Sequence, residues 1–111
     1  MTAALTKPYR LFTDTAMAST TSSASIDVSR LIYGSVSVWW TGTPTGTLTA
    51  EAQNGSDAPW ITISGMTQAT GGTSGNCLFT FTILPFEKIR ITYTASSGSG
   101  VLNACLVAKG Y

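Results

Sequence analysis

Five acidic side chains are the first residues in this 111-residue chain that could do chemistry, and no histidine accompanies them. Glycoside hydrolysis needs two carboxylates that face one cleft, about 5–10 Å apart. None of the five stands in a motif that would build such a pair. We interpret them as turn formers, surface charges and partners of nearby cations. The five are Asp14, Asp27, Glu51, Asp57 and Glu87.

Hydroxyl groups are abundant, but nothing in the sequence activates them. The chain has 19 Thr and 13 Ser, and a nucleophilic hydroxyl needs a neighbouring base. Without histidine there is no imidazole to act as base, proton shuttle or zinc ligand. Lys88 and Lys109 are the remaining candidate bases, and no pattern supports them. We therefore expect a protein that is not an enzyme and has no cofactor.

The polar loops are better explained as turns than as metal or phosphate sites. Asn54, Ser56 and Asp57 offer oxygen ligands, but an EF-hand needs a fixed set of acidic positions that closes with Glu. We interpret this stretch as an Asx turn, although Asn54-Gly55-Ser56 also matches a glycosylation acceptor of secreted eukaryotic proteins. The glycine loops lack the GKS/T ending of a phosphate cradle and are expected to be hairpin turns.

Charge and hydropathy limit the partners. Charged residues make up 10% of the chain and the net charge is +1, whereas about 25% is usual. No basic excess is present to neutralise phosphates, so we expect no nucleic-acid partner. There is no apolar run of roughly 18 residues and no secretory signal pattern, so we expect no membrane association and synthesis in a cytosol.

Alternating apolar positions predict strands over 35–40, 47–52, 60–63, 77–83, 88–93 and 102–108. Clusters of Gly, Pro, Ser and Asn separate them, and no segment has a helical stripe. We predict an all-β domain over 26–111, an antiparallel β-sandwich or jelly-roll-like barrel of seven or eight short strands. Residues 1–25 are expected to be an extended N-terminal arm, either a disordered tail or an arm that orders against a neighbour, with one short strand near Leu11 and Phe12.

The strand pattern also places the two cysteines and the aromatic residues. Cys77 falls on an inward row and Cys105 on an outward row, which favours two reduced thiols over a disulfide. Trp40 and Tyr93 have inward parity. Trp39 lies on the outward row. Three interpretations are open: it is buried at a sandwich edge, it contacts another subunit, or it stacks on a sugar ring. We favour the subunit contact and assign a candidate interface to Trp39, Tyr33, Leu11 and Phe12.

The other outward positions are mostly Ser and Thr. Exposed sheet edges normally carry Lys or other charges that block pairing with a second sheet, and here such protection is sparse. The sequence therefore indicates a protein that assembles with itself or with neighbours.

Several of these pieces occur in a recognisable order. They are VSVWWTGTPTGTL at 36–48, Asp57 shortly before Trp60, KIRITYT at 88–94, SGSG at 97–100 and AKG at 108–110. In this order, residues 26–109 resemble small virion structural proteins of tailed bacteriophages.

The resemblance implies a non-enzymatic virion component, a decoration or cement protein on the capsid, located on the particle and assembled in the host cytoplasm. A tail, collar or head–tail position is the alternative. The expected partners are copies of itself, often as trimers, and the major capsid protein. Arg90 is implied to be structural, pairing with a carboxylate such as Asp57 or Glu51. A different class of function is a carbohydrate-binding or adhesin-like module that uses Trp39, Trp60 or Tyr33 as a platform.

Overall fold

The computed structural model describes residues 8–29, 32–81 and 86–109, and in these ranges the chain forms nine β-strands. The strands are β1 (Tyr9–Ala16), β2 (Thr21–Ser22), β3 (Ile26–Asp27), β4 (Tyr33–Gly42), β5 (Thr45–Gln53), β6 (Ile61–Ala69), β7 (Gly75–Phe81), β8 (Lys88–Ser97) and β9 (Gly100–Lys109). Residues 82 and 83, the end of one predicted strand, lie outside the described residues. None of the described residues forms a helix long and apolar enough to cross a membrane.

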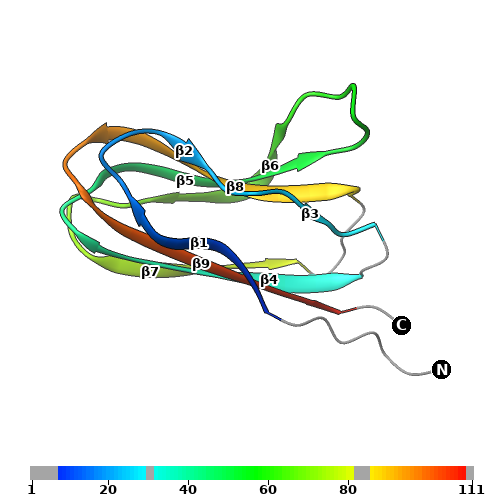
Figure 1. Cartoon of the computed structure of the whole chain (residues 1–111), viewed down its shortest axis with the longest axis horizontal. Helices are drawn as coiled ribbons and strands as arrows, with labels where there is room; N and C mark the ends of the chain where they lie inside the picture. Colours follow the sequence, from blue (N-terminus) through cyan, green and yellow to red (C-terminus); the bar gives the residue numbers. More distant parts are fainter. Residues whose placement is uncertain (1–7, 30–31, 82–85, 110–111) are drawn as a thin grey trace.

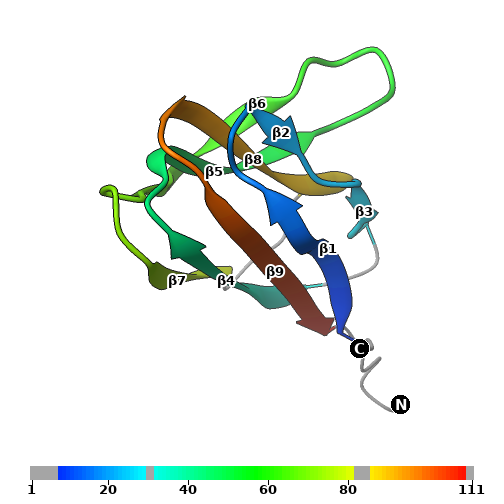
Figure 2. The same cartoon turned by 60° about the vertical axis from the view of Figure 1, so that its left-hand side comes forward.

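The strands form two antiparallel sheets that pack face to face (Figure 1). Sheet A has the order β1-β9-β4-β7, which Figure 2 shows side by side. Sheet B has the order β2-β8-β5-β6, and β3 also pairs with β8. The strand pairs β1·β9, β2/β3·β8, β4·β7 and β5·β6 are nested in the sequence: each pair lies within the segment that joins the two strands of the pair before it. Hydrogen bonding of β9 to β4 and of β8 to β5 arranges these nested pairs into the two sheets of a jelly roll. The predicted antiparallel β-sandwich is confirmed.

The segment expected as an arm forms, from Tyr9 onward, edge strands of both sheets. β1 pairs with β9 in sheet A, and β2 and β3 pair with β8 in sheet B. Between the sheets the chain buries Met17 completely. Residues 1–7 lie outside the described part.

A bulge in β1 corrects the expectation for Leu11 and Phe12. The register with β9 shifts between Arg10 and Phe12, so two consecutive side chains can turn toward the same side, which regular alternation forbids. Leu11 is 7% and Phe12 4% exposed, and both belong to the core. They are therefore core residues, and a partner could not reach them on this surface.

The core lies between the sheets and combines the inward rows predicted from alternation with Leu11, Phe12, Met17 and Val28 from the segment before β4. Trp40 packs against Gly75, where an added Cβ would come within 2.8 Å of the indole ring. Its Nε1 donates to the Thr73 carbonyl oxygen at 2.8 Å. Tyr93 is fully buried, and its hydroxyl oxygen has no hydrogen-bond partner among the described residues. Each fully buried Leu or Ile contributes roughly 1.5–3 kcal/mol to stability.

Candidate interaction surface

The outer surface of sheet A, which we call face A, carries the outward side chains of β1, β9, β4 and β7. Cross-strand neighbours share a face of a sheet, so the register defines its members. They are Arg10, Tyr33, Ser35, Ser37, Trp39, Thr41, Asn76, Leu78, Thr80, Val101, Asn103, Cys105, Val107 and Lys109. Arg10 and Lys109 are the cations of this set, and the exposed Asp14 carboxylate accepts a hydrogen bond from Asn103 at its β1 edge.

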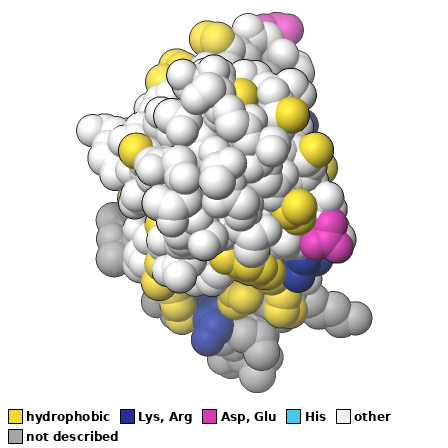
Figure 3. All heavy atoms as spheres, turned by 90° about the vertical axis from the view of Figure 1, so that its left-hand side faces the viewer, with side chains coloured by type: hydrophobic (Ala, Val, Ile, Leu, Met, Phe, Trp, Pro, Cys, Tyr) yellow, Lys and Arg dark blue, Asp and Glu magenta, His cyan; other side chains and the backbone are white. Residues whose placement is uncertain are grey.

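Face A exposes large apolar side chains to water. Leu78 is 60%, Tyr33 43% and Trp39 36% exposed. Viewed toward the end of the sandwich in Figure 3, the surface consists mostly of uncharged polar groups. Hydrophobic side chains gather at the lower side of that view, where sheet A lies, beside charged groups of both signs. Contiguous exposed apolar area on a soluble protein typically marks a contact site.

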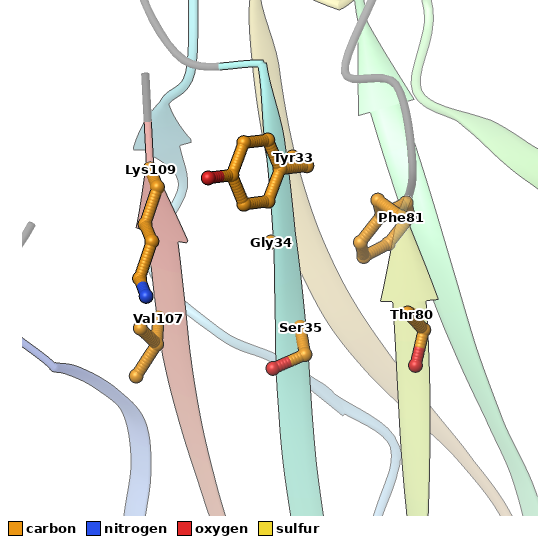
Figure 4. A pocket seen from close by; sticks show the side chains of 7 residues that line it. All are labelled: Tyr33, Gly34, Ser35, Thr80, Phe81, Val107 and Lys109. Atoms are coloured by element: carbon orange, nitrogen blue, oxygen red, sulfur yellow. The ribbon is translucent and has the colours of Figure 1, made fainter. Parts of the chain in front are cut away.

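One end of face A holds a pocket of about 460 Å³. Tyr33 and Ser35 of β4 lie between Lys109 and Val107 of β9 on one side and Thr80 of β7 on the other (Figure 4). The tyrosine ring leans toward Lys109 in that view. The pocket is lined mainly by carbon atoms and has one cation at its rim, so it suits an apolar side chain of a partner.

A hydrogen-bonded cluster fixes the other end of face A. The Arg10 guanidinium lies 5.2 Å from the centroid of the Trp39 ring, and its Nη2 donates to Asn103 Oδ1 at 2.6 Å. The same oxygen accepts the Asp14 backbone N–H at 3.0 Å, and Asn103 Nδ2 donates to Asp14 Oδ1 at 3.3 Å. Asp14 has a φ of 45°, which a side chain of this type tolerates when it makes local hydrogen bonds. Asn103 therefore holds the bulged strand β1 against the sheet. It also positions the Arg10 guanidinium that lies over the Trp39 ring.

Sequence reasoning did not single out Arg10 or Asn103. A usable signal was present, because Asn is depleted in strands and Asn103 stands alone among apolar residues in 101–108. An internal strand position that is polar and only 8% exposed must satisfy its amide within the fold.

The outer surface of sheet B, which we call face B, is polar, and its central charges are paired within the chain. Its register-matched members on β5 and β8 are Thr47, Thr49, Glu51, Gln53, Lys88, Arg90, Thr92 and Thr94.

A cluster around Glu51 lies at the centre of face B. Arg90 Nε lies 2.8 Å from Glu51 Oε1, which also accepts the Thr92 hydroxyl at 2.6 Å. The Arg90 guanidinium covers the Trp60 ring, 4.3 Å from its centroid. The structure thus pairs Arg90 with Glu51, while Asp57 lies in the exposed turn after β5.

The aromatic residues considered for a sugar platform are not brought together. Trp39 belongs to face A, whereas Trp60 lies beside face B, on the opposite side of the sandwich. A guanidinium group also covers one face of each indole ring. Tyr33 lies six residues along β4 from Trp39, at the far end of face A.

Both cysteines are free, with Cys77 directed toward the core and Cys105 on face A. Desolvation by burial raises the pKa of the Cys77 thiol to about 11. In the described part of the chain, no group of three or more His, Cys, Asp or Glu residues could hold a metal ion.

Comparison with known proteins shows similarity in fold rather than in sequence. No protein-family model matches the chain, and no curated protein matches it. Among solved structures, the SPBc2 prophage-derived protein YomS aligns with a TM-score of 0.63 and 12% identity over 96% of both chains.

Two further structures share the fold. A chain of infectious bursal disease virus, strain Gx, aligns with a TM-score of 0.56 and 17% identity. The alignment covers 97% of this chain and 32% of the viral chain. A Bacillus endospore appendage protein, of a family of disulfide-linked pili, aligns with a TM-score of 0.55 and 18% identity over 100% of this chain and 93% of that one. At these identities the similarity is one of fold.

Proposed function

We propose that this chain is a non-enzymatic structural protein of a bacteriophage particle, and specifically a capsid decoration or cement protein. It associates with copies of itself and binds the major capsid protein through face A. The observation that carries the proposal is the composition of face A, which exposes Leu78, Tyr33 and Trp39 and whose charged residues among those described are Arg10, Lys109 and Asp14. A monomer in free solution gains nothing from such a surface, whereas a lattice protein uses it for contact.

Two further observations support a structural role. The fold is a jelly roll, an architecture that occurs in viral capsid domains as well as in lectins and cupins. The solved structures that share the fold include a prophage-derived protein, a virus structure and an appendage protein. The order of the motifs at 36–48 and 88–94, which resembles that of small phage virion proteins, also supports a structural role.

The test is whether the chain is present on particles, and where. Gradient-purified phage particles from the encoding culture are probed by mass spectrometry and by immunogold labelling against the recombinant chain. We expect the chain to co-sediment with particles and the gold to cover the head. Label confined to the tail or neck would replace the decoration role by a tail or collar role, and absence from particles would overturn the proposal.

A matched pair of variants tests face A directly. Particles that lack the chain are incubated with purified protein carrying Tyr33→Ser and Trp39→Ser, or with a control carrying Thr47→Ala and Thr94→Ala on face B. We expect the control to bind like the wild type and the face A variant to lose at least about tenfold in affinity, the usual effect of removing two interface aromatics. Equal binding by both variants would move the contact away from face A.

A further inference from the structure

The edges of the two sheets differ in how they are protected. Among the described residues, β1 and β7 are the edge strands of sheet A, and β2 with β3 and β6 are those of sheet B. An edge strand presents unpaired N–H and C=O groups that can pair with another chain, and proteins block this with charges, bulges, twists or short strands.

Three of these edges have such features. β1 carries Arg10 and Asp14 and two register shifts, with a positive φ at Asp14. β6 has a register shift against β5 and a glycine at φ +79°, Gly65, in its middle. β2 and β3 are only two residues long each.

β7 has none of them. Its seven residues, GNCLFTF, include no charge and no proline. They pair with β4 one to one from Gly75↔Trp40 to Phe81↔Gly34 without a register shift. Leu78, at the centre of the strand, is the most exposed large apolar side chain of sheet A, at 60%. This edge is regular, neutral and open.

We infer that two copies of the chain pair antiparallel along β7, so that sheet A continues into its partner as one eight-stranded sheet. A two-fold axis at Leu78 places this residue opposite its own copy, on the face A side. It also places Cys77 opposite Phe79, two apolar side chains on the inner side, and Asn76 opposite Thr80, two polar side chains on the outer side, so the pairs nearest the axis match in polarity. The strand is therefore complementary to itself, which favours a second copy over an unrelated strand.

The charges of face A support the same occupant. Arg10, Asp14 and Lys109 lie on β1 and β9, the two strands farthest from the proposed axis. The described outward residues of β4 and β7 carry no charge, so two copies meet without repulsion. The pairing also doubles face A, because Tyr33, Trp39 and Leu78 of both copies then lie on one surface. In this respect the inference extends the proposed function by supplying the self-association that it requires.

The interface is small, since one strand pair buries less than the roughly 1,200 Å² of a stable complex. We therefore expect a concentration-dependent dimer in solution that becomes stable when both copies bind one particle. Sedimentation equilibrium on the full-length chain, from about 5 μM to about 500 μM, should show a shift from monomer to dimer. A monomer over that whole range would overturn the inference.

Substitutions at two equally exposed residues distinguish the β7 edge from others. Leu78→Lys places like charges opposite each other on the axis and should abolish the dimer. The matched control is Ile61→Lys on the β6 edge, where the isoleucine is 62% exposed, and it should leave the dimer intact. Circular dichroism melting confirms that both variants fold. Mixing Leu78→Lys with Leu78→Glu should restore a heterodimer, and a failure of that rescue in folded proteins would contradict the pairing.

A cross-link gives a second readout. In a background with Cys77→Ser and Cys105→Ser, Leu78→Cys should form an intermolecular disulfide under mild oxidation. Directly opposed residues of an antiparallel pair have the Cα separation that a disulfide needs. Ile61→Cys in the same background should stay reduced. A dimer without label on particles would refute the phage role alone, whereas labelled particles built from a monomeric chain would refute this pairing alone.

Discussion

Face A and face B are built on sheets of similar size from the same small set of residue types, yet they treat their polar and apolar groups in opposite ways. On face B, Glu51 binds Arg90 and Thr92, and the Thr92 hydroxyl also contacts Ser22 at 2.8 Å. On face A, the hydrogen bonds gather at the Asn103 end, and Tyr33 and Leu78 are left exposed.

The difference distinguishes a surface whose central polar groups are paired within the chain from one that leaves apolar side chains exposed. Face B pairs its central charges, Glu51 and Arg90, within the chain, so these groups gain little by contact with a partner. Face A keeps its polar cluster for holding β1 in place and offers apolar area elsewhere. A low overall charge alone would not reveal which face meets a neighbour, but the distribution of pairing does.

The reactivity of Cys77 tests which side of sheet A is the inside, and it has the largest expected effect. Because burial raises the Cys77 pKa to about 11, the thiolate fraction at pH 8 is about 100-fold lower than for an ordinary thiol. In the Cys105→Ser protein, alkylation at pH 8 should be slower in the folded state than in urea by about that factor. A raised thiol pKa also means that folding holds the proton more tightly, so stability should fall as the pH rises from about 9 toward 11. Equal rates in the folded state and in urea would contradict the inward placement.

Asn103→Ala tests whether face A depends on its polar cluster. The change removes the acceptor for Arg10 and for the Asp14 backbone N–H, so it should lower the free energy of unfolding by about 2–3 kcal/mol. Urea denaturation measures this. Thr94→Ala, an exposed position of face B, is the control and should change stability by less than about 0.5 kcal/mol. Similar losses at the two positions would remove the contrast between the faces.

Glu51→Gln tests the pairing on face B. Glu51 and Arg90 are 16% and 26% exposed as side chains, so water partly screens the pair and the expected loss is about 1 kcal/mol. The wild type should lose most of this difference in about 1 M salt, because screening weakens the ion pair. A loss that does not respond to salt would show that packing of Arg90 on Trp60 matters more than the charge.

Tyr93→Phe probes the core that both faces share, and its effect should be the smallest. The buried hydroxyl has no hydrogen-bond partner among the described residues, so its removal should leave stability unchanged or raise it by up to about 1 kcal/mol. Thermal and urea unfolding measure the change. A clear loss of stability would indicate a bound water on that hydroxyl.

The fold was predictable because alternation with a period of two is a local signal. It identified the inward rows around Val38, Ala50 and Ile91, and thereby the sandwich. The order of the strands was not predictable in the same way, because the pairing of β1 with β9 is a contact between residues far apart in the sequence and depends on the arrangement of the strands between them.

The surface was predictable only in part, for a related reason. Trp39 and Tyr33 are visible from parity alone, and both are exposed on face A. Leu11 and Phe12 were misplaced because a bulge interrupts alternation, and a bulge has no signature within β1 itself. Asn103 and Arg10 meet only through the register of two strands from opposite ends of the chain. The choice of Glu51 over Asp57 as the partner of Arg90 likewise follows from register, since Glu51 lies directly across from Arg90.

The nested arrangement of strand pairs also affects how the chain folds as it is made. Its outermost pair joins Arg10 to Asn103, residues separated by 93 positions, so β1, the first of the described strands to be translated, pairs with β9, the last of them. At common translation rates β1 waits roughly 5–20 s for β9. The inner pairs β5·β6 and β4·β7 can close during this time, while the strand from Tyr9 to Ala16 remains without its partner. Long-range closure of this kind is slow, and crowded nascent chains in a cell that produces many copies would face their strongest tendency to mispair in this interval.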